Sequence, residues 1–111
     1  MTQRDMRFWH GWLVVLTLLV GAANMVDLPM EPHETFVVRT VEEMHDRGDF
    51  VVPYLNDRPR LNKPPLNYWL TALVADLAGD LGRVAPWEAR FVSVLAGGGL
   101  VAICGALGTA L

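Results

Sequence analysis

Apolar positions are concentrated at the two ends of the chain. Residues 8–26 carry no formal charge apart from the titratable His10, and residues 91–111 carry none. A helix needs about 20 apolar residues to cross a bilayer, and each run meets or approaches that length. Residues 27–90 hold nearly all of the charge. The pattern predicts transmembrane helices at 8–26 and 86–111, which flank a water-exposed loop at 27–85.

Within that loop, apolar residues recur at intervals of three and four, which is typical of amphipathic helices. One pattern covers 33–47, and its apolar face is formed by Phe36, Val37, Thr40, Val41 and Met44. A second covers 64–79, with an apolar stripe of Leu66, Trp69, Leu70, Leu73, Leu77 and Leu81. Asp76 and Asp80 interrupt the second pattern. We therefore expect both segments to be juxtamembrane helices that lie along the bilayer surface.

The flanks of the first apolar run predict the orientation of the chain. Arg4 and Arg7 precede the run, and basic residues favour the cytoplasmic side. Residues 1–7 are then cytoplasmic, and the loop faces the periplasm from the inner (cell) membrane of a bacterium. A secretory signal peptide, cleaved near residues 21–24, is the alternative interpretation of this run.

Charge, cysteine content and small residues narrow the class of protein. The net charge of −3 argues against a nucleic-acid partner. Cys104 is the one cysteine, so no disulfide framework is expected within the chain. The second apolar run is rich in glycine and alanine, which allows close helix packing in lipid. Two such spans need partners, so we expect an N-terminal piece of a larger polytopic protein whose C-terminal transmembrane region is missing.

An acidic cluster follows the first apolar run and comprises Asp27, Glu31, His33 and Glu34. A carboxylate at this position could act as a general base where lipid substrates arrive. The simpler interpretation is a solvated helix N-terminus, where the helix dipole favours acids. One histidine and one carboxylate do not form a specific metal motif. No metal site is predicted, and a possible divalent metal has no support in the sequence.

A basic cluster, Arg58, Arg60 and Lys63, lies between the two predicted short helices, after an extended stretch with a turn at residues 56–57. Clustered cations at a membrane surface suit a phosphate or an anionic headgroup. Nonspecific attraction to headgroups, or pairing with nearby acids, is the alternative. Pro59, Pro64 and Pro65 stiffen the segment, so that little entropy remains to be lost on binding.

Two aromatic residues, Tyr68 and Trp69, follow the basic cluster. We interpret both as anchors at the membrane interface, where aromatic side chains are enriched. Tyr68 is also a candidate for substrate contact.

Taken in order, these motifs resemble the first extracytoplasmic loop of family 39-type membrane glycosyltransferases. That family includes the protein O-mannosyltransferases and the bacterial aminoarabinose transferase that acts on lipid A. The resemblance covers residues 9–111 with near-constant spacing, and its motifs are Glu34, Glu43-Met44, Gly48-Asp49, Pro53, Lys63-Pro64-Pro65, Tyr68-Trp69 and the "WEAR" that ends at Arg90.

The resemblance implies an all-α membrane protein, the N-terminal fragment of a polytopic GT-C-type glycosyltransferase. Such an enzyme moves a sugar from a polyprenyl-phosphate carrier to a lipid, glycan or protein acceptor. It also implies that Lys63 contacts the carrier phosphate and that a carboxylate serves as the base. Combined with the basic cluster, it makes Arg58 or Arg60 a candidate to aid Lys63 in this contact. His33 stands where the family has its catalytic aspartate, so the base is Glu34, His33 or a residue of the missing part. A small two-span membrane protein that binds lipids or partners, or an inactive truncated product, is the alternative.

Overall fold

The computed structural model describes residues 2–25, 28–80 and 82–111. It contains four helices: α1 (Gln3–Ala23), α2 (Pro32–Arg47), α3 (Leu66–Ala78) and α4 (Pro86–Ala110). The chain is mostly helical, as the sequence predicted. A small antiparallel hairpin of β1 (Tyr54–Leu55) and β2 (Arg58–Pro59) is added between α2 and α3.

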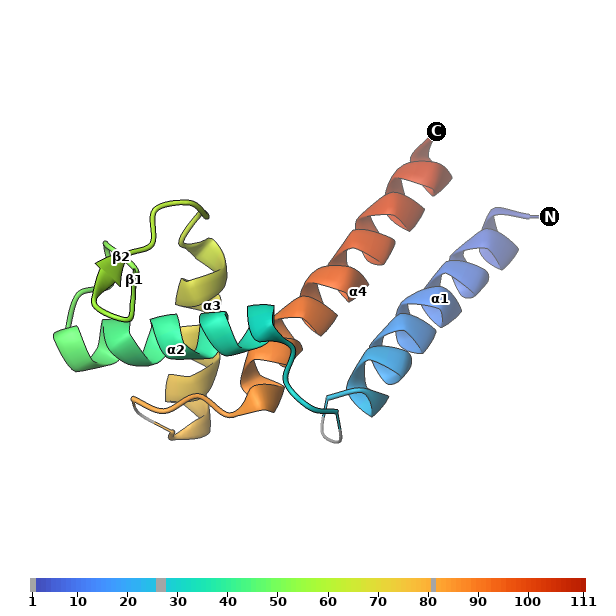
Figure 1. Cartoon of the computed structure of the whole chain (residues 1–111). Helices are drawn as coiled ribbons and strands as arrows, with labels where there is room; N and C mark the ends of the chain where they lie inside the picture. Colours follow the sequence, from blue (N-terminus) through green and yellow to red (C-terminus); the bar gives the residue numbers. More distant parts are fainter. Residues whose placement is uncertain (1, 26–27, 81) are drawn as a thin grey trace.

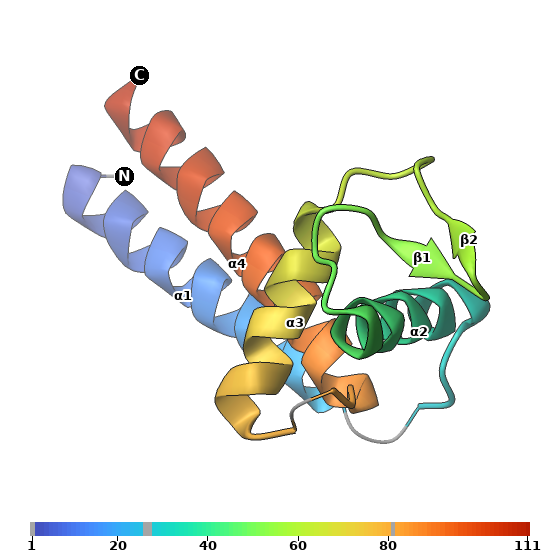
Figure 2. The same ribbon diagram turned by 90° about the vertical axis from the view of Figure 1, so that its left-hand side faces the viewer.

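The two long helices form an antiparallel pair, with both chain termini at the same end (Figure 1). Helices α2 and α3 cross each other beside the opposite end of the pair (Figures 1 and 2). Helices α1 and α4 are long and apolar enough to cross a membrane, with mean hydropathies of 1.4 and 2.0. No residue of α1 is buried, so this helix is not enclosed within a protein core in the described part of the chain.

Helix α1 begins at Gln3, five residues before the predicted span, because its first turn is capped. The Thr2 hydroxyl accepts a hydrogen bond from the Asp5 main-chain N–H at 3.3 Å, and the Asp5 carboxylate accepts one from the Thr2 N–H at 3.0 Å. This reciprocal arrangement satisfies amides that have no partner within the helix. The predicted end of the span, Val26, lies outside the described residues.

Glycines set the close approach of α1 and α4. A Cβ atom added at Gly98 would lie 2.7 Å from Leu18 Cδ2, and one added at Gly21 would lie 2.8 Å from Val94 Cγ1. Both distances are well below van der Waals contact, so each glycine makes room for a side chain of the other helix. This packing matches the role expected of small residues between membrane helices.

We predict that Gly98→Val weakens this helix pair by about 1–3 kcal/mol, because the added methyl groups must displace Leu18. Gly99→Val is the matched control, since a Cβ added at Gly99 meets nothing within 4 Å. Thermal denaturation of the full chain in detergent would measure both changes. Equal losses for the two variants would contradict the proposed packing role of Gly98.

The core of the loop region lies between α2, α3 and the start of α4. Its buried residues include Val41 and Met44 of α2 and Tyr68, Ala72 and Ala75 of α3. His45 Nε2 also lies 2.8 Å from Asp76 Oδ1, which links the C-terminal half of α2 to α3. Small residues on α3 allow α2 to pack closely against it.

The apolar stripe predicted on α3 lies on the uncovered side of that helix. Leu66, Trp69, Leu70, Leu73 and Leu77 are all exposed, Leu77 by 80%. Leu81 of the predicted stripe lies outside the described residues. The leucines of α3 and Trp69 therefore face away from the protein core, which α3 fills with Tyr68, Ala72 and Ala75. The predicted helix at 64–79 begins two residues later, because Pro65 occupies the N-cap position.

Two glycines end the short helices, and one turn confirms a local prediction. Gly48 and Gly79 end α2 and α3 in the left-handed conformation, with φ of 65° and 89°. Asn56 and Asp57 both have positive φ, which is the geometry that a two-residue hairpin turn requires. The sequence predicted this turn without the strands that it joins.

Candidate functional site

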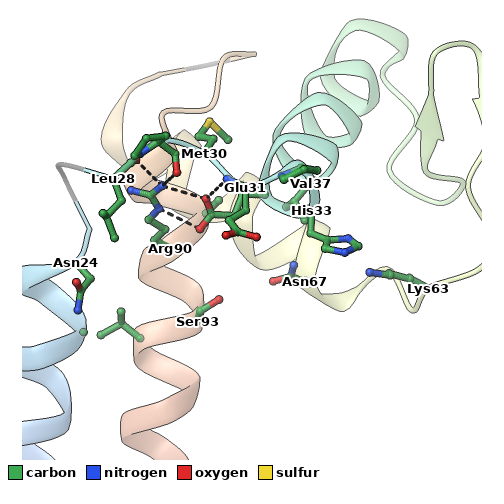
Figure 3. A pocket seen from close by; sticks show the side chains of 16 residues that line it. Asn24, Leu28, Met30, Glu31, His33, Val37, Lys63, Asn67, Arg90 and Ser93 are labelled. Carbon is green, nitrogen blue, oxygen red and sulfur yellow. Dashed lines mark hydrogen bonds and ion pairs between the residues drawn. The ribbon is translucent and has the colours of Figure 1, made fainter.

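A cavity of about 830 Å³ lies between the two long helices and the loop region (Figure 3). Helices α1 and α4 contribute mostly small or apolar side chains, among them Gly21 and Val94. The N-terminus of α2 contributes His33 and Glu34, and the segment around the start of α3 contributes Lys63 and Asn67. The cavity therefore has an apolar wall of Gly21, Ala89 and Val94 on the long helices, next to Arg90 and Ser93 of α4, and a polar rim on the loop.

The structure brings three of the candidate residues to this cavity, namely His33, Glu34 and Lys63. The amine of Lys63 points toward the imidazole of His33 (Figure 3). Glu34 contacts Arg90 of α4. Glu31 of the predicted acidic cluster also lines the cavity. Asp27 lies outside the described residues.

The hairpin places the other two basic residues elsewhere. Arg60 donates from Nε to the Tyr68 hydroxyl at 3.0 Å, and its guanidinium lies 5.1 Å from the centre of the Phe36 ring. Arg58 is exposed on β2 and lines, with Arg60, a separate cavity of about 270 Å³. The three cations are therefore divided between two places.

Tyr68 is 2% exposed and belongs to the core. Its interpretation as a membrane-interface anchor was wrong, because its side chain is buried in the core cluster with residues of α2 and Arg60 binds its hydroxyl. Trp69 is 46% exposed, and its indole N–H donates to the Phe50 carbonyl at 2.6 Å.

Glu34 is held by Arg90 through two parallel hydrogen bonds. Arg90 Nε lies 3.0 Å from Glu34 Oε1, and Arg90 Nη2 lies 3.0 Å from Glu34 Oε2. The Glu31 main-chain N–H also donates to Glu34 Oε2 at 3.1 Å. The bidentate geometry is the strong form of an arginine–carboxylate pair. It joins the first turn of α2 to the first turns of α4.

The Arg90 guanidinium also donates hydrogen bonds to main-chain carbonyls between α1 and α2. Arg90 Nη1 donates to the Met25 carbonyl at 3.1 Å, and Nη2 donates to those of Leu28 and Pro29 at 2.9 and 3.3 Å. We missed this role in the sequence, where Arg90 figured only as part of a motif. A charged residue at the start of a long apolar run was the available signal, because such a charge needs a partner.

The Arg90 guanidinium holds the pKa of the Glu34 carboxyl below its usual range, against the opposing effect of burial. The carboxylate is therefore ionised at neutral pH, and both of its oxygens are occupied. A general base needs a free lone pair and a pKa close to the operating pH. The lowered pKa and the three hydrogen bonds weaken Glu34 as a base and fix its position.

This pairing predicts that the thermal stability of the chain depends on pH. Because the pKa of Glu34 is lower in the folded state, its stabilising contribution is present above the unfolded pKa and is lost as pH falls through the folded one. We expect the melting temperature of wild type to fall more than that of Glu34→Gln between about pH 6 and pH 3. Asp46→Asn is the control, since Asp46 is exposed on α2, and it should follow wild type. Parallel curves for wild type and Glu34→Gln would contradict the pairing.

Metal ligands do not cluster in the described ranges. No group of three or more His, Cys, Asp or Glu side chains there is placed to hold a metal ion. The chemistry open to the cavity rests on the imidazole, the amine, the guanidinium and the carboxylates already named.

Comparisons with curated proteins find partial similarity to membrane-enzyme sequences. The chain is 29% identical over 92 residues to the undecaprenyl phosphate-alpha-4-amino-4-deoxy-L-arabinose arabinosyl transferase of Serratia proteamaculans, over 79% of this chain and 16% of the relative. It is 38% identical over 50 residues to the protein of the same name from Photorhabdus laumondii, over 45% of this chain and 9% of the relative.

An uncharacterized protein of Aquifex aeolicus is 40% identical over 42 residues, which cover 38% of this chain and 8% of the relative. The chain thus spans less than a fifth of the length of each of these relatives. No family model and no solved structure matches it. Fold and similarity together describe a mostly helical chain with two helices long and apolar enough to span a membrane, part of which is similar to transferases of a lipid-linked sugar. The particular similarity is to the two arabinosyl transferases.

Proposed function

We propose that this chain is the N-terminal part of an integral membrane glycosyltransferase of the family 39 type. The enzyme would move a sugar from a polyprenyl-phosphate carrier to a lipid, glycan or protein acceptor. The observation that carries the proposal is the cavity in which Lys63 and His33 face each other beside an apolar wall of α1 and α4. Such a site suits a ligand with a phosphate head and a hydrocarbon tail. The names of the two arabinosyl transferases, which specify an undecaprenyl phosphate-linked sugar, support the choice of donor.

The placement of the chain in a membrane is part of the proposal. Helices α1 and α4 would span the inner membrane of a bacterium, with Arg4 and Arg7 on the cytoplasmic side and residues 27–85 on the periplasmic side. The packing of Gly21 against Val94 and of Gly98 against Leu18 supports an α1 that is retained rather than cleaved. The exposed leucine face of α3 would contact lipid or the remainder of the longer protein.

Lys63 would act on the leaving phosphate. Negative charge develops on the phosphate as the bond between the sugar and its bridging oxygen breaks. A fixed ammonium beside it therefore stabilises the transition state more than the ground state. Pro64 and Pro65 directly follow Lys63 and restrict the backbone around it.

The acceptor must lose a proton as it attacks the sugar carbon. Glu34 and His33 were the candidate bases. The bidentate pair with Arg90 leaves Glu34 in a positioning role, in which it holds the start of α2 against α4. This role leaves His33, or a residue beyond these 111, to take the proton.

A transfer assay in membranes tests the proposal. It uses the full-length enzyme of which residues 1–111 are proposed to be the N-terminal part. We expect label to pass from a radiolabelled polyprenyl-phosphate sugar to an endogenous lipid, glycan or protein, and none to pass from a nucleotide sugar. A folded chain that binds the polyprenyl-phosphate sugar and never transfers it would contradict the proposal and favour the two-span lipid-binding alternative. Residues 1–111 alone are expected to be inactive, since two spans cannot enclose both donor and acceptor.

A further inference from the structure

The polar rim of the cavity holds two basic groups that face each other. Figure 3 shows the amine of Lys63 directed toward the ring of His33, with Asn67 beside the space between them. Neither basic side chain forms a hydrogen bond or an ion pair with another described residue, whereas Arg60 and Arg90 are both engaged. Both basic side chains are exposed. They are therefore available to a ligand.

The remaining charges around this pair leave it open to an anion. Glu34 is neutralised by Arg90 at 3.0 Å. Glu31 lines the same cavity and is the one other carboxylate among its described lining residues. His33 is the second residue of α2, and a helix N-terminus carries partial positive charge that favours a bound anion. An ammonium, an imidazole and a helix N-terminus thus converge on one space.

We propose that His33, in its protonated form, and Lys63 together bind the phosphodiester of an isoprenoid carrier lipid. This inference rests on the proposed function, because it concerns the same cavity, and it assigns His33 a binding role in place of that of a base. The isoprenoid tail would leave the head along the wall formed by Gly21, Ala89 and Val94, which also line the cavity. The proton of the acceptor would then pass to a residue beyond these 111.

Binding of the anion is coupled to protonation of His33. A phosphodiester between the two basic groups favours the imidazolium, so binding takes up a proton. Affinity should therefore fall as pH rises through the range where an imidazole loses its charge, by up to about tenfold per pH unit for one linked proton.

A binding titration with the full chain in lipid nanodiscs measures this coupling. The probe is a polyprenyl phosphosugar, whose phosphodiester keeps its single negative charge throughout the range in which an imidazole titrates. We expect wild type to lose affinity across this range. His33→Asn should bind about tenfold more weakly at pH 6 and show no pH dependence. Arg39→Ala removes an exposed cation from the surface of α2 and should match wild type.

Competition with other ligands tests whether the bound phosphate belongs to an isoprenoid carrier, to a phospholipid or to free phosphate. The matching polyprenol should bind weakly, and phosphatidylglycerol and inorganic phosphate should compete poorly. Equal competition by phosphatidylglycerol would overturn the assignment to an isoprenoid carrier.

Unchanged affinity and pH dependence in His33→Asn would overturn the role of His33, and so would a loss of transfer without a loss of affinity. Either result leaves the proposed transferase intact, because the transfer assay with wild type is independent of both.

Discussion

Replacing Lys63 with alanine in the full chain is expected to reduce sugar transfer at least about 100-fold. The ammonium is proposed to stabilise charge that develops on the leaving phosphate, so the main loss should appear in the rate of transfer at saturating donor. Lys63 and His33 are the basic residues of the rim without partners among the described residues, and no other rim cation is free to replace the lysine. Radiolabel transfer from a polyprenyl-phosphate sugar, measured at several donor concentrations, would separate the rate from the apparent donor affinity.

Two variants control this experiment. Arg39→Ala removes the same charge from the exposed side of α2 and should transfer at the wild-type rate. Lys63→Arg keeps a cation on a longer, planar group and should recover part of the activity, since arginine and lysine differ in geometry more than in charge. Wild-type transfer by Lys63→Ala, with unchanged donor affinity, would remove Lys63 from the mechanism.

Helical periodicity located α2 and α3 within two residues, because spacings of three and four report local geometry. It did not indicate which face of α3 would be covered. The rule that large apolar side chains are buried holds for a chain surrounded by water. In α3, Leu73 and Leu77 are exposed, and Ala72 and Ala75 pack against the neighbouring helices. A surface of this kind fits a chain whose environment is lipid or further protein. The residue pattern of one helix does not reveal which of these surrounds it.

The cationic cluster shows a second limit. Arg58, Arg60 and Lys63 are near neighbours in sequence, so we expected them to act together. The hairpin turn at Asn56 and Asp57 directs the chain so that Arg60 reaches Tyr68 and Lys63 reaches the cavity. A shift of a few residues in a strand or turn redirects side chains completely. Linear proximity is therefore a poor guide to a shared site.

The pair of Glu34 and Arg90 shows a third limit. The two residues are 56 positions apart, and each has an adequate local explanation, as an acid in a first helical turn and as a basic flank of an apolar run. Their contact depends on the crossing of α2 over the start of α4, which no local pattern specifies. The resemblance to a known loop placed both residues in motifs without indicating that they meet.

Among residues that do not contact the phosphate, we expect the largest effect on sugar transfer from a change in the Glu34–Arg90 pair. Arg90→Lys keeps the positive charge but cannot reproduce contacts with two carboxylate oxygens and three main-chain carbonyls, which need the planar guanidinium. The start of α2 would lose its fixed position against α4, and His33 would move with it. We expect transfer to fall about 10-fold or more, since small misplacements of binding groups have effects of this size.

A double-mutant cycle with Glu34→Gln distinguishes this positioning role from a general loss of stability. Residues in one hydrogen-bonded pair have coupled effects, whereas unrelated defects add. If Arg90 acts by holding Glu34, Arg90→Lys should cost much less activity in the Glu34→Gln background than in wild type. The donor affinity of each variant, compared with its transfer rate, would show whether the shift of α2 disturbs binding or the chemical step. Strictly additive losses would mean that Arg90 acts through the carbonyls of Met25, Leu28 and Pro29 alone, and Glu34 would then have no part in shaping the cavity.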